Sequence, residues 1–162
     1  MKFIGDRTLG KLVRKLRALG FDAAYWSGGN LEGAARVAAA EGRILLTRSR
    51  KAPKEAQGLK ILIVDADNPS EQLGETLSRL KLKAIPANYF SRCLLCNEEL
   101  RPISKEEAEG RVPDFIYRSY DSFHICPRCR RIYWPGTRLQ KMLKMITRTQ
   151  TDYADKDDPP VD

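Results

Sequence analysis

Short apolar runs alternate with helical patterns in the first half of the chain. The runs cover residues 2–4, 22–26, 43–47 and 59–64, and each is typical of a buried strand. At 8–20, at 31–40 and from 69 onward, apolar residues recur instead at the spacing of one helix face. Strands that alternate with helices in this way predict an α/β fold. Its sheet should be mostly parallel and covered by helices on both faces.

The first predicted helix has two contrasting faces. Thr8 is its predicted N-cap, and Gly20 is expected to end it. Its apolar face carries Leu9, Leu12, Val13, Leu16 and Leu19. Its opposite face carries Lys11, Arg14, Lys15 and Arg17. A basic face of this kind either follows the phosphates of a nucleic acid or simply faces solvent.

All four cysteines lie in two Cys-x-x-Cys pairs, Cys93-Leu-Leu-Cys96 and Cys126-Pro-Arg-Cys129. Two such turns facing each other form a closed tetrahedral set of thiolates, which suits a structural Zn²⁺. The 29 residues between the pairs exceed the roughly 15–20 of the usual template, so the predicted zinc ribbon carries an insertion. Two disulfides or one redox-active pair are the alternatives, and His124 is a further candidate ligand.

The predicted domain organisation has four parts. Residues 1–85 form the α/β domain and 86–137 the zinc ribbon. A helix follows over 138–148, because Leu139, Met142, Leu143 and Ile146 recur at helical spacing. Residues 149–162 are rich in aspartate and nearly free of apolar residues, so we expect a disordered acidic tail.

The charge of the chain indicates a polyanionic partner. The net charge is +8, but five aspartates against one lysine give residues 150–162 a charge of −4, which leaves +12 on residues 1–149. Nucleic acid is favoured over a membrane surface, since no basic amphipathic stretch has an aromatic anchor. The sequence has no transmembrane run and no signal peptide, so the expected location is the cytoplasm, where thiols stay reduced.

Polar residues follow the predicted strands at their carboxyl ends, where α/β sheets bind ligands. They are Asp6, Asn30, Glu32, Arg48, Ser49, Arg50, Asp65 and Asp67. Carboxylates gathered at one sheet edge suit Mg²⁺ or Mn²⁺, and two such ions support phosphodiester cleavage. The alternative is that these residues only cap helices and form turns.

The ribbon segment combines aromatic residues with arginines. Tyr117, Tyr120, Phe123, Tyr133 and Trp134 lie among arginines that include Arg130 and Arg131. Such a mixture can stack on the bases of single-stranded RNA and hold its backbone. A small module also needs aromatic residues for its own core, and we assign Tyr133 and Trp134 to that core.

Several motifs together resemble a known family. They are Asp6, Leu9-Gly-Lys-Leu12, Arg14, Leu16-Arg17, Gly20-Phe-Asp22, Gly42-Arg-Ile-Leu-Leu-Thr-Arg48, Arg50, Gln72-Leu73, Arg92-Cys93, Cys96-Asn97, Leu100, Val112-Pro113, Cys126-Pro127, Cys129, Tyr133-Trp134 and Gly136. With these, residues 1–140 resemble PIN-like ribonuclease domains with a C-terminal zinc ribbon. The same unit is found at the C-terminus of mutator-type exonucleases.

The resemblance implies a PIN-like fold and a metal-dependent ribonuclease. Asp6 matches the first acidic position of the family and is the expected Mg²⁺ or Mn²⁺ ligand, with Glu32, Asp65 and Asp67 as further candidates. At Ser49 the family usually has an aspartate, so we expect this hydroxyl to bind phosphate or metal-bound water. Acid is also usual near Asn30, and histidine at Arg138. The expected RNA-binding residues are Arg14, Arg17, Arg48, Arg50, Arg130 and Arg131.

Three functions therefore compete. The first is a Mg²⁺- or Mn²⁺-dependent ribonuclease whose zinc ribbon helps to bind RNA. The second is a catalytically degenerate RNA-binding protein on the same fold, since Ser49 stands in place of the expected acid. The third is a protein-docking module. Because PIN-like domains often pair, a homodimer is also compatible with the resemblance.

Overall fold

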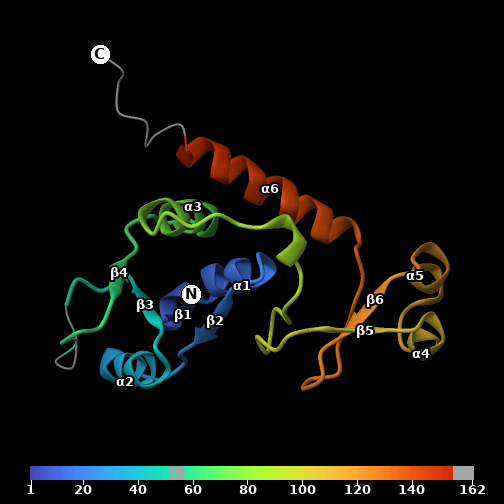
Figure 1. Ribbon diagram of the computed structural model, residues 1–162, viewed down its shortest axis with the longest axis horizontal. Coiled ribbons are helices and arrows are strands. Elements are labelled where there is room, and N and C mark those ends of the chain that lie inside the picture. The colour runs from blue at the N-terminus through green and yellow to red at the C-terminus, as the bar shows by residue number, and fades with distance from the viewer. Residues whose placement is uncertain (52, 54–56, 155–162) are drawn as a thin grey trace, which may run out of the picture.

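The computed structural model describes residues 1–51, 53 and 57–154 of the chain (Figure 1). Its strands are β1 (Lys2–Gly5), β2 (Asp22–Tyr25), β3 (Ile44–Thr47), β4 (Ile61–Ile63), β5 (Arg101–Ile103), β6 (Phe123–Ile125) and β7 (Ile132–Tyr133). Its helices are α1 (Gly10–Ala18), α2 (Leu31–Glu41), α3 (Pro69–Arg79), α4 (Lys105–Ala108), α5 (Asp114–Ser119) and α6 (Thr137–Ala154), with short 3₁₀ turns η1 (Arg7–Leu9) and η2 (Pro86–Asn88). Within these residues, no helix is both long and apolar enough to cross a membrane.

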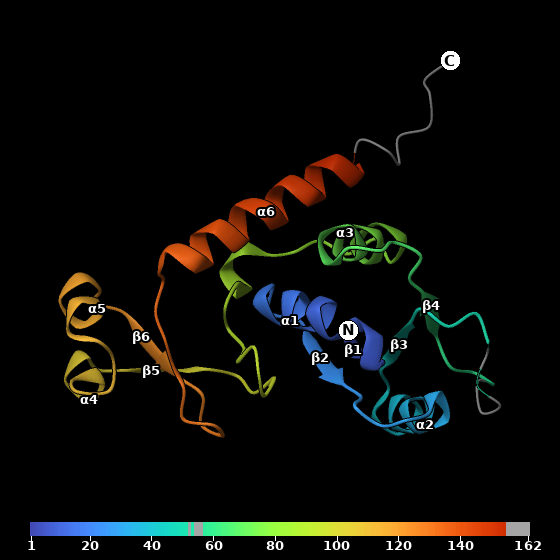
Figure 2. The same ribbon diagram turned by 180° about the vertical axis from the view of Figure 1, so that it is seen from behind.

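The first four strands form a parallel sheet in the order β2-β1-β3-β4. Helix α2 covers one face of this sheet, α1 and α3 lie on the other, and α6 packs on α3 (Figures 1 and 2). The chain runs from β1 to β2 on one side and then crosses to β3 on the other. The ends of β1 and β3 therefore flank a topological switch point, where such sheets bind their ligands.

Side chains along each strand point alternately to the two faces of the sheet, and each face has its own hydrophobic core. Phe3 and Leu46 point toward α1 and α3, while Ile4 and Leu45 point toward α2. Alanines 34, 35 and 38 are fully buried, which lets α2 lie close to the strands. The predicted fold class is confirmed, with a parallel sheet flanked by helices and followed by a four-cysteine module.

The start of the first helix differs from our prediction. Thr8 is not the capping residue. Asp6 caps this segment, because its carboxylate accepts the backbone N–H of Thr8, and the turn η1 precedes α1. Aspartate with an extended backbone serves this role as well as threonine does. The helical segment therefore begins two residues earlier than the hydrophobic pattern suggested.

The second module is built on the antiparallel sheet β5-β6-β7. Its small core holds Ala108, Val112, Ile116 and Phe123, with Tyr117, Tyr120 and Trp134 partly buried against it. Tyr133 is half-buried and hydrogen-bonded to Cys93. The aromatic residues of this segment therefore contribute largely to the core of the ribbon and to its metal site.

The ribbon docks on the α/β domain through Arg17. Its side chain is 6% exposed and donates three hydrogen bonds to carbonyl oxygens, to Ala23 at 2.8 Å, Leu94 at 2.9 Å and Leu95 at 3.1 Å. Asn97 adds a second link, because its side chain accepts the N–H of Ala23 and donates to Asp22. Arg17 thus joins α1 and β2 to the first cysteine turn.

Helix α6 returns the chain from the ribbon to the α/β domain. It runs from Thr137 to Ala154, past residue 148, where we expected the helix to end. Ile146 is buried in the main core, and Met142 packs against it. Residues 155–162 of the expected acidic tail lie outside the described residues.

Replacing Arg17 with methionine tests this docking. We expect Arg17→Met to lower the free energy of unfolding by about 3 kcal/mol, because three carbonyls lose a charged donor while the side-chain volume is nearly kept. Urea denaturation monitors the change. The matched control is Arg14→Met, an exposed position on the same helix, which should change stability by less than about 0.5 kcal/mol. Equal losses in the two variants would contradict the docking role.

Candidate active site and metal centre

The two cysteine pairs form turns of the same geometry. In the first, Cys93 O accepts the N–H of Asn97 at 3.0 Å and Cys93 Sγ accepts the N–H of Cys96 at 3.4 Å. In the second, Cys126 O accepts the N–H of Arg130 at 2.9 Å, and Cys126 Sγ accepts the N–H of Cys129 at 3.4 Å. Asn97 and Arg130 both take positive φ, so the chain reverses at equivalent points.

The four sulfur atoms lie close enough to hold one ion. All four thiols are free, and their Sγ atoms lie within 4.8 Å of one another. Cys93 Sγ and Cys129 Sγ are 3.7 Å apart, close to the spacing of about 3.8 Å that Zn–S bonds of about 2.3 Å give in a tetrahedron. The donor set therefore fits a structural Zn²⁺ and leaves no open coordination position for catalysis.

Electrostatics favour a cation at this centre. Burial raises the pKa of the Cys96 thiol to about 12, and the neighbouring Cys129 and Cys93 add to the rise. Burial also opposes ionisation of Cys93, but hydrogen bonds to its sulfur, first that of Tyr133, outweigh it and lower its pKa to about 7. Four thiolates this close repel one another, whereas a divalent ion removes that repulsion.

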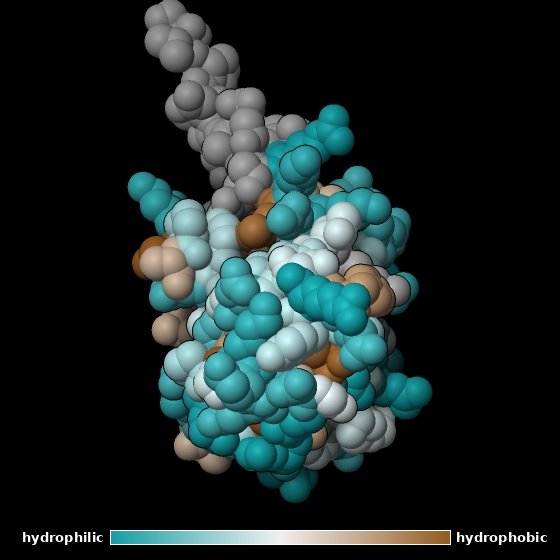
Figure 3. Space-filling view, turned by 90° about the vertical axis from the view of Figure 1, so that its right-hand side faces the viewer, coloured by the Kyte–Doolittle hydropathy of each residue, from teal (hydrophilic) through white to brown (hydrophobic). Residues whose placement is uncertain are grey.

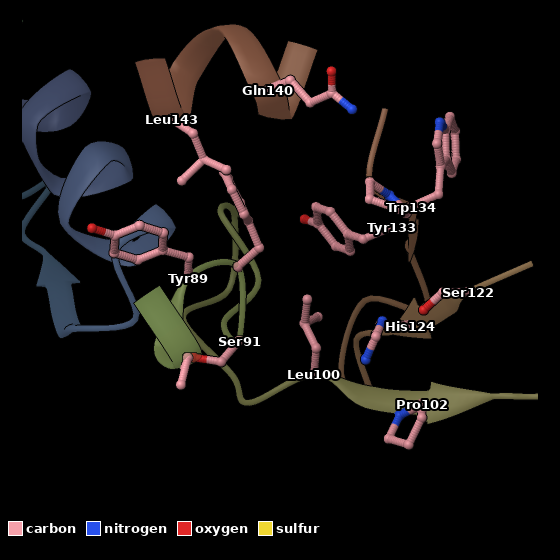
Figure 4. Close-up of a pocket in the computed structure, with 13 residues that line it drawn as sticks. Tyr89, Ser91, Leu100, Pro102, Ser122, His124, Tyr133, Trp134, Gln140 and Leu143 are labelled. Atoms are coloured by element: carbon pink, nitrogen blue, oxygen red, sulfur yellow. The ribbon is translucent and has the colours of Figure 1, made fainter. Parts of the chain in front are cut away.

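His124 does not belong to this thiol cluster. It lies on β6 and lines a separate cavity of about 360 Å³ between the linker, the ribbon and α6, together with Tyr89, Trp134 and Gln140 (Figure 4). This cavity adjoins the end of α1, since Phe90 N–H bonds Ala18 O. None of the predicted catalytic residues lines it.

Asp6 lies at the topological switch point and is 8% exposed. Its Oδ1 accepts the N–H of Thr8 at 2.9 Å and the hydroxyl of Thr8 at 2.6 Å, and its Oδ2 accepts the hydroxyl of Thr47 at 2.5 Å. A carboxylate offers about four acceptor positions. Among the described residues, the fourth position, on Oδ2, has no hydrogen-bond donor.

Thr47 connects Asp6 to Ser49. Thr47 is 1% exposed at the end of β3, and its hydroxyl accepts the N–H of Ser49 at 3.0 Å while donating to Asp6. The Ser49 hydroxyl accepts the N–H of Lys51 at 3.2 Å, which leaves its proton free to donate. The sequence analysis missed Thr47. The available signal was a hydroxyl at the last position of an otherwise apolar strand, beside a strand that ends in Asp6.

Asn30 and Glu32 lie at the start of α2. The Asn30 side chain accepts the N–H of Gly33 at 3.0 Å and caps this helix. Glu32 follows in the first turn and is half-buried. Asn30 therefore has the capping role that we weighed as the alternative to a metal site.

Arg48 and Arg50 pair with the two aspartates that follow β4. Arg48 reaches Asp67 at 2.7 Å and Arg50 reaches Asp65 at 2.9 Å. Neither aspartate caps α3, whose N-cap is Asn68. Glu75, missed from the sequence, accepts the N–H groups of Asp65 and Ala66 and thereby fixes this turn.

The predicted carboxylates do not assemble into one set. Among the residues that the structure describes, the cysteines are the one group of three or more His, Cys, Asp or Glu side chains placed to hold a metal. Asp6 thus contributes a single carboxylate at its sheet edge. One carboxylate fits a Mg²⁺ that takes its remaining ligands from water and substrate phosphate.

Comparison with known proteins places this chain in a family. The family model described as the Mut7-C RNAse domain matches residues 1–146. The chain belongs to the Mut7-C RNAse domain family. This confirms the resemblance found in the sequence and supports a ribonuclease-type function, with RNA as the class of substrate or partner. Searches of curated proteins and of solved structures gave no match.

The arginines expected to bind RNA in this Mut7-C domain fall into different settings. Arg14, Arg130 and Arg131 are exposed. Arg17 is a correction, because it is buried and its N–H groups bind carbonyls. Figure 3 looks onto the ribbon end of the molecule and shows a mostly hydrophilic surface with few hydrophobic side chains. The surface of the ribbon on that face is therefore mainly polar rather than hydrophobic.

A cysteine variant tests the metal centre of this Mut7-C domain. We expect Cys126→Ser to reduce bound zinc from about one ion per chain to near zero, because a closed structural site needs all four thiolates. Elemental analysis of purified protein measures the metal, and thermal unfolding measures the loss of ribbon stability. The control is His124→Ala, which should keep its zinc. Zinc loss in His124→Ala alone would instead assign the fourth ligand to the histidine.

Proposed function

We propose that this Mut7-C domain is a metal-dependent ribonuclease centred on Asp6, which holds Mg²⁺ or Mn²⁺. The supporting observation is the setting of its carboxylate. It lies nearly buried at the switch point of the sheet and is oriented by Thr8 and Thr47. One of its acceptor positions has no donor among the residues that the structure describes. Three donors fix both oxygens in place, so the open position has a defined direction.

Each neighbouring residue has a separate task in this proposal. Thr47 holds Oδ2 of Asp6, and Ser49 donates its hydroxyl proton to a phosphate oxygen or to a metal-bound water. Glu32, half-buried near the same edge, is the candidate for a second carboxylate. A bound Mg²⁺ or Mn²⁺ would lower the pKa of an attacking water and neutralise charge on the cleaved phosphodiester.

Arg48 and Arg50 are proposed to hold the RNA strand. Their partners Asp67 and Asp65 have side chains that are 93% and 60% exposed. Ion pairs exposed to this degree contribute about 0–1 kcal/mol, so a phosphate can replace the carboxylate at little cost. A guanidinium binds phosphate through two parallel hydrogen bonds, which suits a strand that must be held in one orientation.

The ribbon is proposed to extend the RNA-binding surface. Arg130 and Arg131 are exposed on the second cysteine turn, and the Zn²⁺ fixes the backbone that carries them. Because the ion has no open position, its contribution is stability and shape rather than chemistry.

A second candidate is an RNA-binding protein that no longer cleaves. It is favoured by the neutral Ser49 and by the lack of a gathered carboxylate set among the described residues. The third, a protein-docking module, predicts no RNA binding by Arg48 and Arg50.

Cleavage of end-labelled single-stranded RNA with Mn²⁺ or Mg²⁺ separates these candidates. We expect the zinc-loaded wild type to cleave and Asp6→Asn to lose activity by about 100-fold or more, because a charged metal ligand becomes a weak neutral one. The control is Asp121→Asn, an exposed ribbon residue, which should cleave as the wild type does. A silent wild type that binds RNA, together with cleavage in Ser49→Asp, would favour the degenerate protein.

Thr47 allows a sharper test of carboxylate positioning. Thr47→Val keeps the shape but removes the hydroxyl that binds Asp6, so we expect kcat to fall about tenfold with little change in KM. Thr47→Ser restores a hydroxyl and should recover most of the rate. If both variants lose the same activity, packing rather than the hydrogen bond is responsible.

A further inference from the structure

A second cavity lies between α1, the end of β2 and the first cysteine turn. Its volume is about 380 Å³. Lys11, Val13 and Arg14 line it from α1, Tyr25 from β2, and Leu94 and Leu95 from the ribbon. The cavity is therefore lined by basic residues of α1, by an aromatic residue of β2 and by apolar residues of the zinc ribbon.

Tyr25 is fixed beside the proposed cleavage centre. It pairs in register with Gly5, the residue before Asp6, and the N–H of the following Trp26 bonds Gly5 O at 2.9 Å. The Tyr25 hydroxyl donates to Arg7 O at 3.2 Å. Its ring lies against Gly10, 3.5 Å from where a Cβ would stand. Tyr25 nevertheless remains 45% exposed, so a held aromatic surface faces the cavity.

The basic side of the cavity has two available cations. Lys11 and Arg14 are both exposed on α1 and stand three positions apart, on the same helix face. Arg17, one turn further, also lines the cavity, but it is buried and its Nε and Nη1 donate to carbonyls. Positive charge for a ligand therefore comes from the part of α1 nearest to Asp6.

The third side of the cavity is formed by the first cysteine turn of the ribbon. Arg17 holds the carbonyls of Leu94 and Leu95, which places the Leu95 side chain, 41% exposed, at the cavity. An apolar side chain, an aromatic ring and two exposed cations of α1 therefore line the same cavity.

We propose that this cavity binds one nucleotide of single-stranded RNA next to the cleaved phosphodiester. The base stacks on Tyr25 and contacts Leu95, while Lys11 and Arg14 hold the adjoining phosphates. Exposed aromatic rings combined with arginine and lysine are the means by which proteins hold unpaired nucleotides. A duplex keeps its bases stacked on one another, so its bases do not reach this ring. This inference rests on the proposed ribonuclease function for the identity of its ligand.

Binding measurements with an inactive protein test the subsite apart from catalysis. In the zinc-loaded full chain carrying Asp6→Asn, fluorescence anisotropy gives the Kd for a labelled oligouridylate. We expect Tyr25→Ala to raise Kd about tenfold, because stacking on one base is lost. Tyr25→Phe keeps the ring and should stay within about twofold. With an abasic oligonucleotide of equal length, Tyr25→Ala should have no effect, since there is no base to stack.

Two further variants complete the test. Arg14→Gln should lower the slope of log Kd against log salt by about one, as expected for a lost phosphate contact. Phe115→Ala removes an aromatic ring that is 68% exposed on α5, and it should leave Kd unchanged. If thermal unfolding shows that Tyr25→Ala is poorly folded, Leu95→Ser on the ribbon side of the cavity replaces it, with an increase in Kd again expected.

The outcomes separate this inference from the proposed function. A wild type that fails to cleave, with Kd still raised by Tyr25→Ala, would remove the ribonuclease proposal and keep the nucleotide site. A wild type that cleaves, with Kd unchanged in Tyr25→Ala and Leu95→Ser, would overturn the nucleotide site alone. An equal loss of affinity in Phe115→Ala would also overturn it, because the effect would not be local.

Discussion

The structure depends on one buried guanidinium. Burial lowers the pKa of Arg17 through desolvation, which shows that this environment disfavours its charge. The carbonyls of Ala23, Leu94 and Leu95 compensate through three hydrogen bonds. Two of the three acceptors belong to the ribbon. An α/β domain without the ribbon would lose two of the three carbonyls that bind Arg17, so this one side chain couples the two modules.

Through this docking contact, a structural Zn²⁺ in the four-cysteine site would affect the proposed nucleotide site without touching it. A Zn²⁺ held by the four cysteines would fix the first cysteine turn. The same turn supplies the carbonyls that bind Arg17 and carries Leu95, which lines the cavity beside Tyr25. Asn97 strengthens the connection. Burial opposes ionisation of Asp22, but hydrogen bonds from Arg43 and Asn97 outweigh it and lower its pKa. The four-cysteine site, the Arg17 contact and the proposed nucleotide site are therefore connected through the first cysteine turn.

Sequence patterns were sufficient for features that depend on local spacing. Strand and helix periods located the sheet, and two Cys-x-x-Cys pairs located the metal centre. Contacts between segments that are distant in the sequence could not be predicted from these patterns. Arg17 shares a helix face with Arg14, and only a turn 77 residues later decides that one is buried and the other exposed. Likewise, the sequence did not show that the loop after β3 places an arginine opposite each of Asp65 and Asp67.

The two cysteine turns have similar backbone geometry but differ in the residue that reverses the chain. In the first it is Asn97, an amino acid that tolerates a left-handed conformation and whose amide here faces β2. In the second it is Arg130, a side chain with no such backbone preference, left in solvent. Two loops of the same geometry therefore present one residue that anchors the ribbon to β2 and one residue that is exposed to solvent. Exchange of these two residues would remove the contacts of Asn97 with Ala23 and Asp22 while leaving the four metal ligands intact.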